Sequence, residues 1–356
     1  MNDYLKNALD CFDEYFPFGK NILDEIRRTR IDFQTCWQYL KNREVCIPPA
    51  QWLTIEVTNL CNSNCIFCAY QYQSKFRMKR GVISDEIFNK AIEDFKQIGG
   101  KNIGLTPFSG EPLLDKKIIN RIKKIKAEGF WTGFFTNGIM LNYIDALSLL
   151  KSGVDGLTVS TAPFDSKAYE MIYRNNHYAD VLNGLKNLLT IRNQIRLDLP
   201  IGIAFRSHIP RRRALSLPDF REIIMPLLTE ADWKLLTVNT RGFDSWGGVI
   251  KSEDLVGMMR LALNPRMKSV PCSWLSNLYV TWEGQVRACP CRYSLSEHAD
   301  GKDDLYLGNL RQVTLFDMLN GERLKRLYMK FKEKKLPDLC QQCTMYKPLI
   351  ENGMSK

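Results

Sequence analysis

The sequence predicts an α/β protein built on a parallel sheet. Between residues 52 and 239, segments rich in β-branched and aromatic residues alternate six times with segments of helical period. Helical crossovers connect parallel strands in a right-handed sense. The sheet is either open and doubly wound or closed into a partial barrel, and in both cases ligands bind at the carboxyl ends of the strands. Functional residues are therefore expected directly after strands.

The first strand is predicted at residues 53–57, where three apolar residues alternate with polar ones. Ser84 can cap the following helix, because its hydroxyl can accept a hydrogen bond from an N–H group of the first turn. Gly99 and Gly100 end this helix, and the second strand is predicted at residues 103–108.

The later units repeat this alternation. A helix with isoleucines at positions 118, 122 and 125 is closed by Gly129. Further strands are predicted at residues 130–135, 156–160, 197–205 and 233–238, and further helices at 142–151, 181–189 and 220–228. These units complete six strands with helical connections.

After Pro271 the alternation stops. Residues 278–282 and 285–289 indicate a β-hairpin that turns at Gly284, and a helix is predicted at 315–331. The predicted organisation is a helical N-terminal cap (1–49), the α/β domain (50–250), a linker or helix (251–270), a C-terminal module (271–346) and a tail (347–356).

Composition narrows the class of protein. The chain has 356 residues and a formal charge of +11, with no apolar run of the ~20 residues that would span a bilayer. The N-terminus lacks the features of a secretory signal, so we expect a cytoplasmic protein and no membrane partner. A basic protein can bind nucleic acid, an anionic substrate or an acidic partner. No zinc finger or interleaved aromatic and basic module is present, which argues against nucleic acid.

Eight of the 11 cysteines fall into two groups, which argues for metal binding in a reducing compartment. Cys61, Cys65 and Cys68 follow the first strand. Three thiolates leave one position of a metal centre open, as in an iron–sulfur cube with one free iron; the alternatives are a zinc site or unrelated buried thiols. The scattered cysteines at 11, 36 and 46 are interpreted as buried apolar residues.

Polar residues follow other strands. After the second strand, Ser109, Gly110 and Glu111 precede a proline; glycine allows close approach of a ligand, and the carboxylate can receive an ammonium group. The alternative is an acidic helix start. Asn137 follows the third strand and Ser160 ends the fourth. After the fifth strand, basic residues could bind an anionic substrate, although the sequence favours a solvated basic loop: Arg206, His208, Arg211, Arg212 and Arg213.

The three-cysteine loop, with Phe67 just before its last cysteine, resembles the signature of the radical S-adenosylmethionine (SAM) superfamily. The resemblance implies a partial (β/α)6 barrel in which Cys61, Cys65 and Cys68 hold a 4Fe-4S cluster. It also implies a SAM site formed by Phe67, Ser109, Gly110, Glu111 and Ser160. Two positions depart from the family pattern: Ser109 replaces a glycine, and Ala162-Pro163 replaces Asp-Gly after Ser160.

The second cysteine group resembles the twitch module, a truncated form of the SPASM extension of this superfamily. Cys272, Gly284 and Cys289 have its spacing, and Cys340 and Cys343 form the late Cys-x-x-Cys pair. The resemblance implies one auxiliary 4Fe-4S cluster on Cys272, Cys289, Cys340 and Cys343. Cys291 is surplus and is a candidate substitute ligand.

The resemblance implies reductive cleavage of SAM to a 5′-deoxyadenosyl radical, with an external electron donor such as flavodoxin or ferredoxin. We expect an oxidoreductase that abstracts hydrogen from a small molecule. The expected reaction is a two-electron dehydrogenation of a sugar, an aminocyclitol or a phosphorylated metabolite, with electron transfer through the auxiliary cluster. The alternatives are a peptide-modifying maturase and, from another class, a non-catalytic zinc-binding structural protein.

Overall fold

The computed structural model describes residues 50, 52–72, 79–265, 268, 271–289 and 303–347. The predicted N-terminal cap, the three scattered cysteines, Cys291 and all of the predicted tail except Lys347 lie outside the described residues.

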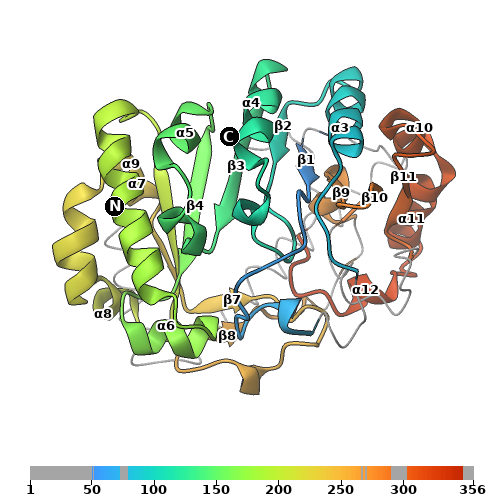
Figure 1. The fold of residues 1–356 in the computed structure, drawn as a ribbon. Coiled ribbons are helices and arrows are strands. Elements are labelled where there is room, and N and C mark those ends of the chain that lie inside the picture. The colour runs from blue at the N-terminus through green and yellow to red at the C-terminus, as the bar shows by residue number, and fades with distance from the viewer. Residues whose placement is uncertain are drawn as a thin grey trace, which may run out of the picture.

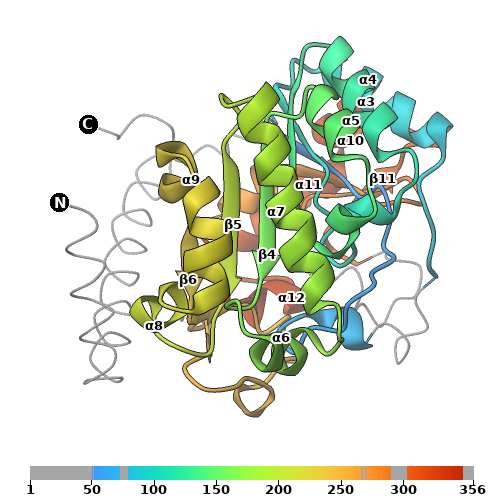
Figure 2. The same ribbon diagram turned by 60° about the vertical axis from the view of Figure 1, so that its left-hand side comes forward.

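Six parallel strands lie side by side in one sheet, in the order of the sequence (Figures 1 and 2). They are β1 (Trp52–Ile55), β2 (Asn102–Gly104), β3 (Trp131–Thr136), β4 (Gly156–Thr161), β5 (Ile201–Arg206) and β6 (Thr237–Asn239). A doubly wound sheet would reverse its strand order, whereas sequential order is typical of a barrel. The predicted fold class, α/β with a partial barrel, is confirmed.

Helices cover the outer face of this sheet, and the main hydrophobic core lies between the two layers (Figure 2). They are α3 (Asp85–Gln97), α4 (Ile118–Ala127), α5 (Ala146–Lys151), α7 (Tyr178–Ile195) and α9 (Glu230–Leu235). Two shorter helices, α6 (Ser166–Tyr173) and α8 (Arg211–Leu215), lie at the carboxyl edge of the strands, and α6 packs in a second core cluster with Cys65 and Ile66. The predicted cap of α3 is confirmed, because the Ser84 hydroxyl accepts a hydrogen bond of 3.3 Å from Ile87 N. Short 3-10 turns occupy 69–72, 112–114, 139–142, 252–254 and 273–276.

The last β–α unit was predicted with the wrong boundaries. The first half of the predicted strand 233–238 belongs to α9, and β6 begins only at Thr237. A capping box starts this helix: the Thr229 hydroxyl accepts from Asp232 N at 3.2 Å, and the Asp232 carboxylate accepts from Thr229 N at 2.8 Å. The predicted helix 220–228 is a π-helical turn at Phe220–Ile224 followed by a 3-10 turn that contains Pro226.

The segment predicted as a linker or helix forms no α-helix over its described residues, 251–265 and 268. It contains a 3-10 turn at Ser252–Asp254 and strand β8 (Arg260–Leu261), which pairs in parallel with β7 (Arg241–Phe243). A single strand pair is small, so this segment is held mainly by its contacts with neighbouring elements.

The C-terminal segment extends the barrel sheet, which the sequence did not predict. The predicted hairpin is confirmed as β9 (Leu278–Val280) and β10 (Gln285–Arg287), and β11 (Tyr306–Asn309) follows. β9 pairs in parallel with β1, so the sheet order is β11-β10-β9-β1-β2-β3-β4-β5-β6. The predicted helix 315–331 is two helices that meet at Gly321, α10 (Leu315–Asn320) and α11 (Glu322–Lys332); α12 (Asp338–Gln341) follows.

Glu56 joins the barrel to the C-terminal strands. Its buried carboxylate accepts hydrogen bonds from Tyr279 Oη at 2.5 Å and from Trp282 N at 3.4 Å. Tyr279 Oη also accepts from Phe108 N at 2.9 Å. Burial raises the pKa of Glu56 to about 7, against the effect of these hydrogen bonds.

We expect Glu56→Gln to change how stability depends on pH. The folded carboxyl has a raised pKa, so the unfolded chain releases this proton first and the parent loses stability as pH rises from about 4.5 to 7. Relative to the parent, the variant should therefore gain on the order of 3 kcal/mol between pH 5 and pH 8. Urea unfolding at both pH values measures this difference. Exposed Glu93→Gln is the control, and equal pH dependence in parent and Glu56→Gln would contradict the prediction.

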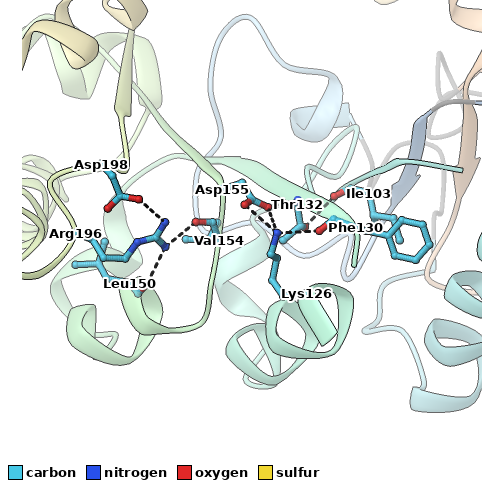
Figure 3. Close-up of polar contacts among 9 residues, drawn as sticks. All are labelled: Ile103, Lys126, Phe130, Thr132, Leu150, Val154, Asp155, Arg196 and Asp198. Atoms are coloured by element: carbon cyan, nitrogen blue, oxygen red, sulfur yellow. Dashed lines mark hydrogen bonds and ion pairs between the residues drawn. The ribbon is translucent and has the colours of Figure 1, made fainter. Parts of the chain in front are cut away.

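Polar contacts hold the loops at the amino-terminal edge of the strands (Figure 3). Lys126 Nζ donates to both oxygens of Asp155, at 2.9 and 2.7 Å, and Asp155 accepts from Thr132 N at 2.7 Å. Arg196 donates to the carbonyl oxygens of Leu150 and Val154. These contacts fix one edge of the barrel, so the loops at the opposite edge can serve function.

Candidate functional site

The three-cysteine loop leaves β1 and lies against the end of α6. Ile66 N donates to Ile172 O at 2.9 Å, and Asn64 N donates to Tyr173 O at 3.2 Å. Cys65 is buried, and Cys61 and Cys68 are partly exposed. The last turn of α6 therefore holds the loop through backbone hydrogen bonds. The sequence did not predict this helix.

Gln71 holds the loop from its other side. Its Nε2 lies 3.5, 3.1 and 3.2 Å from the carbonyl oxygens of Cys65, Ile66 and Cys68. Its Oε1 accepts a hydrogen bond of 2.6 Å from Arg174, a residue in the left-handed region with φ of 53°. No sequence motif marks Gln71, because its role depends on a turn that forms only in the fold.

Burial favours the protonated form of the three cysteine thiols. It raises the pKa of Cys65 to about 12 and that of Cys68 to about 11, and it raises the pKa of Cys61 well above its ordinary value. Mutual repulsion between the thiolates adds to the effect at Cys61 and Cys65. A soft metal centre that replaces the protons removes this penalty, so the loop suits metal ligation.

The turn at Ser109–Glu111 contacts the cysteine loop directly. Glu111 N donates to Leu60 O at 2.7 Å. A Cβ atom at Gly110 would lie 2.7 Å from Thr58 O and 3.1 Å from Asn59 Cα, so only glycine allows this approach. The turn and the loop form one unit.

We expect Gly110→Ala to separate this turn from the loop. The clash is with backbone atoms, which cannot rotate away, so the variant should lose about 1–3 kcal/mol of stability. Thermal unfolding of the protein measures the loss. An unchanged midpoint would contradict the described approach of the two segments.

Glu111 points into this unit and is buried. Its carboxylate accepts hydrogen bonds from Thr136 Oγ1 at 2.7 Å, Asn137 N at 2.7 Å and Leu113 N at 3.1 Å. Burial nevertheless raises its pKa to about 7. A cation that binds beside Glu111 would favour the carboxylate, so the position suits an ammonium group.

Asn137 connects β3 to the same loop. Its Nδ2 donates to Asn62 Oδ1 at 2.7 Å and lies 3.8 Å from Cys61 Sγ. The sequence suggested Asn137 by its position alone, and the structure places it beside the first cysteine.

Phe67, Ser160 and Arg206 form a second wall of the site. Arg206 Nε donates to Ser160 Oγ at 3.0 Å, and its guanidinium lies 5.8 Å from the centre of the Phe67 ring. The Ser160 hydroxyl and Tyr173 Oη are 3.2 Å apart, and the Tyr173 ring meets Phe67 edge-on at 5.7 Å. Tyr173 was not predicted, since α6 was not.

The remaining predicted basic residues do not join this wall. Arg211, Arg212 and Arg213 form most of α8. Arg212 and Arg213 are exposed, and Arg211 donates to Leu236 O at 3.4 Å. Anion binding by these arginines stays a prediction, and the solvated basic segment stays its alternative.

The second cysteine group surrounds one end of a large cavity. Cys272, Cys289, Cys340 and Cys343 all line a cavity of about 880 Å³, which continues along the inner face of the barrel strands. Burial raises the pKa of the Cys272 thiol to about 11, and the positive charge of Lys268 acts against this shift. Four soft donors around one hollow fit an iron–sulfur cluster by number and chemistry.

Residues 244–246 connect the two cysteine groups. Trp246 Nε1 donates to Phe67 O at 3.0 Å, and Ser245 N donates to Thr344 Oγ1 at 3.1 Å. Thr344 Oγ1 in turn donates to Asp244 at 2.9 Å. Because Phe67 precedes Cys68 and Thr344 follows Cys343, this short segment fixes one group relative to the other.

Among the described residues, no three His, Cys, Asp or Glu side chains gather as they would around a single metal ion. The choice between zinc and clusters therefore depends on family membership. The radical SAM superfamily model matches residues 55–200, and the model of the SPASM iron–sulfur cluster-binding domain matches residues 272–344. The chain therefore belongs to the radical SAM superfamily and carries a C-terminal SPASM/twitch iron–sulfur domain. Its cofactors are SAM and a 4Fe-4S cluster, with an additional iron–sulfur cluster in the SPASM domain.

Sequence relatives include GTP 3′,8-cyclase of Lactiplantibacillus plantarum, which is 29% identical over 136 residues, or 38% of this chain and 40% of that protein. The match thus spans less than half of the relative's length. Among solved structures, BtrN in complex with AdoMet and 2-DOIA has a TM-score of 0.51 at 16% identity, covering 84% of this chain and 94% of BtrN. Streptococcus suis SuiB bound to precursor peptide SuiA has a TM-score of 0.52 at 12% identity, covering 88% and 75%.

At these identities the two structures show a shared fold.

No helix in the described ranges combines the length and the hydropathy that crossing a membrane would require.

Proposed function

We propose that this radical SAM enzyme catalyses a two-electron dehydrogenation of a small molecule. The observation that supports the proposal is the cavity, which runs from the inner face of the barrel to the four C-terminal cysteines. Phe108, next to the Ser109–Glu111 turn, and Trp246, which donates to Phe67 O, also line this cavity. A substrate held there would therefore border both the radical-generating site and a second redox centre. The oxidation would remove two hydrogens from the substrate.

In this proposal Cys61, Cys65 and Cys68 hold the catalytic cluster, which leaves one coordination position for the amino and carboxylate groups of SAM. Glu111 accepts a hydrogen bond from the N–H groups of this amino group, since its carboxylate is buried beside the loop. Gly110 lets the turn that carries Glu111 approach the backbone of the cysteine loop. The four named side chains and this glycine come from two neighbouring strand ends.

The other proposed SAM contacts are Phe67, Ser160 and Ser109. Phe67 offers a ring face for adenine, and the Ser160 hydroxyl offers a polar contact next to Arg206. Ser109 is buried where the family has a glycine. These residues orient the nucleoside end of the cofactor.

The auxiliary cluster is assigned to Cys272, Cys289, Cys340 and Cys343, with Cys291 as the candidate substitute. With four protein thiolates it has no open position for substrate. When bound, the catalytic cluster and SAM supply the radical that takes a hydrogen atom, and the auxiliary cluster supplies an acceptor for the electron that follows. A base or water takes the accompanying proton, which balances the reaction. An external donor such as flavodoxin or ferredoxin would reduce the catalytic cluster.

The cavity walls indicate the class of substrate. Aromatic side chains dominate them, including Trp52, Phe108, Trp131, Phe135, Trp246 and Tyr279. Three glycines in register across β2, β3 and β4 make room for the indoles, since a Cβ at Gly133 would lie 2.7 Å from the Trp131 ring. Such a surface accommodates a flat or cyclic apolar face.

The charged residues that line the cavity narrow the class of substrate further. The charged side chains among the described lining residues are Asp155 and Asp244, and no described lysine or arginine lines the cavity. A phosphate would find no cation there and would lose its hydration without compensation. We therefore favour a neutral or amine-bearing ring compound, such as a sugar or aminocyclitol, over a phosphorylated metabolite.

Anaerobic incubation of the reduced enzyme with SAM and sets of such compounds tests the proposal. We expect 5′-deoxyadenosine together with a product two hydrogens lighter than its substrate. A product of unchanged mass would contradict dehydrogenation. A cross-link formed within a peptide would instead identify a peptide-modifying maturase and would overturn the small-molecule proposal.

A further inference from the structure

Lys268 carries a buried positive charge to the C-terminal Cys-x-x-Cys pair. Its side chain is 6% exposed. Nζ lies 2.7 Å from Cys340 O, 2.9 Å from Gln341 O and 2.8 Å from Cys343 O. It also donates to Asn264 Oδ1 at 2.6 Å. These four atoms are all acceptors, so the ammonium form, which offers only donors, fits them.

This contact comes from outside the matched SPASM domain. The domain begins at Cys272, whereas Lys268 and Asn264 belong to the preceding segment that the sequence suggested was a linker. The lysine reaches across to the loop between the last two cysteines. Its acceptors are backbone carbonyl oxygens of the Cys-x-x-Cys turn, so the contact depends on the path of the backbone there.

A cation in this position has a direct electrostatic consequence. Four thiolates and a cube of charge about +2 together carry about −2, and one-electron reduction makes this about −3. A nearby positive charge therefore stabilises the reduced form more than the oxidised form. Because the ammonium is buried, water and salt screen it only weakly.

We propose that Lys268 is a positioning residue that raises the reduction potential of the auxiliary cluster and so makes it a better electron acceptor. The inference rests on the proposed assignment of Cys340 and Cys343 as cluster ligands. It adds to that assignment a residue that contacts the ligand turn but does not bind iron.

Four variants separate charge from structure. Lys268→Met removes the charge and keeps the length of the side chain, and Lys268→Arg keeps the charge. Asn264→Asp leaves the acceptor for Nζ in place but adds a carboxylate that cancels the field of the ammonium. Asn264 is exposed, so this variant should fold. Lys335→Met removes a lysine of the same domain whose side chain is 78% exposed.

The test is an anaerobic redox titration of the full-length, two-cluster protein monitored by electron paramagnetic resonance. Addition of SAM identifies the signal of the catalytic cluster, because only that signal should respond. For Lys268→Met we expect the ratio of reduced to oxidised auxiliary cluster at a fixed potential to fall about tenfold, or 59 mV for one electron. Asn264→Asp should shift in the same direction, whereas Lys268→Arg and Lys335→Met should match the parent.

An unchanged potential in Lys268→Met that retains the auxiliary cluster would overturn the inference. If Lys268→Met fails to retain this cluster, the potential of Asn264→Asp tests the inference instead. An unchanged potential in Asn264→Asp would also overturn the inference. Absence of an auxiliary signal in the parent would overturn the ligand assignment and the inference with it. An auxiliary signal that is present in the parent but has the same potential in Lys268→Met would overturn the inference and leave the ligand assignment intact.

Discussion

Cys65→Ala should reduce formation of 5′-deoxyadenosine from SAM under dithionite to background. Cys65 is the buried member of the three-cysteine loop, and two remaining thiolates cannot hold a cube that leaves only one iron open. Uncoupled SAM cleavage requires no substrate, so this assay works while the substrate is unidentified. Chromatographic quantification of 5′-deoxyadenosine in parent and variant measures the effect.

The control is Cys46→Ala, which removes a cysteine outside both groups. It should retain the rate of the parent. Equal turnover in Cys65→Ala and the parent would show that this loop does not hold the catalytic cluster.

Glu111→Gln should weaken SAM binding about ten- to hundredfold, which is the range for loss of a charge-assisted hydrogen bond. Glutamine is nearly isosteric but neutral, so a hydrogen bond from the amino group loses the charge assistance that the carboxylate gives. In the parent the pKa of Glu111 is raised to about 7 by burial, so the carboxylate forms only above that pH. SAM affinity of the parent should therefore fall as pH drops below about 7, whereas that of the variant should stay low throughout.

Equilibrium dialysis with radiolabelled SAM at pH 6 and pH 8 measures both effects. Glu86→Gln, which replaces an exposed glutamate at the start of α3, is the matched control and should bind as the parent does. A variant at Glu111 with unchanged affinity at pH 8 would exclude this residue as the partner of the amino group.

The sequence predicted the part of the fold that depends on local patterns. Alternating apolar residues identified the first strand, and Ser84 and Gly129 correctly marked the start and end of helices. The unit at 220–239 failed because Trp233 and its neighbours are equally compatible with strand and helix, and the capping box at Thr229 decides for helix. Pairing of β9 with β1 links residues more than 200 positions apart, which no local pattern encodes.

In the candidate site, too, the sequence predicted what depends on local spacing and missed what depends on the fold. Spacing located the cysteines, and the structure brings Asn137 and the turn at Glu111 to the same loop. The residues that hold the cysteine loops in place were not predicted, because they bind backbone groups. Gln71 and Lys268 each donate to carbonyl oxygens of cysteines. A backbone carbonyl belongs to every residue, so sequence alone does not reveal which ones need a partner.

Iron and acid-labile sulfide, measured after anaerobic purification and reconstitution, test the central claim that the chain holds two clusters on two cysteine groups. We expect about eight iron and eight sulfide per chain in the parent, and about four of each in both Cys65→Ala and the double variant Cys340→Ser/Cys343→Ser. Stoichiometric zinc without sulfide in the parent would contradict the account and support a structural zinc protein.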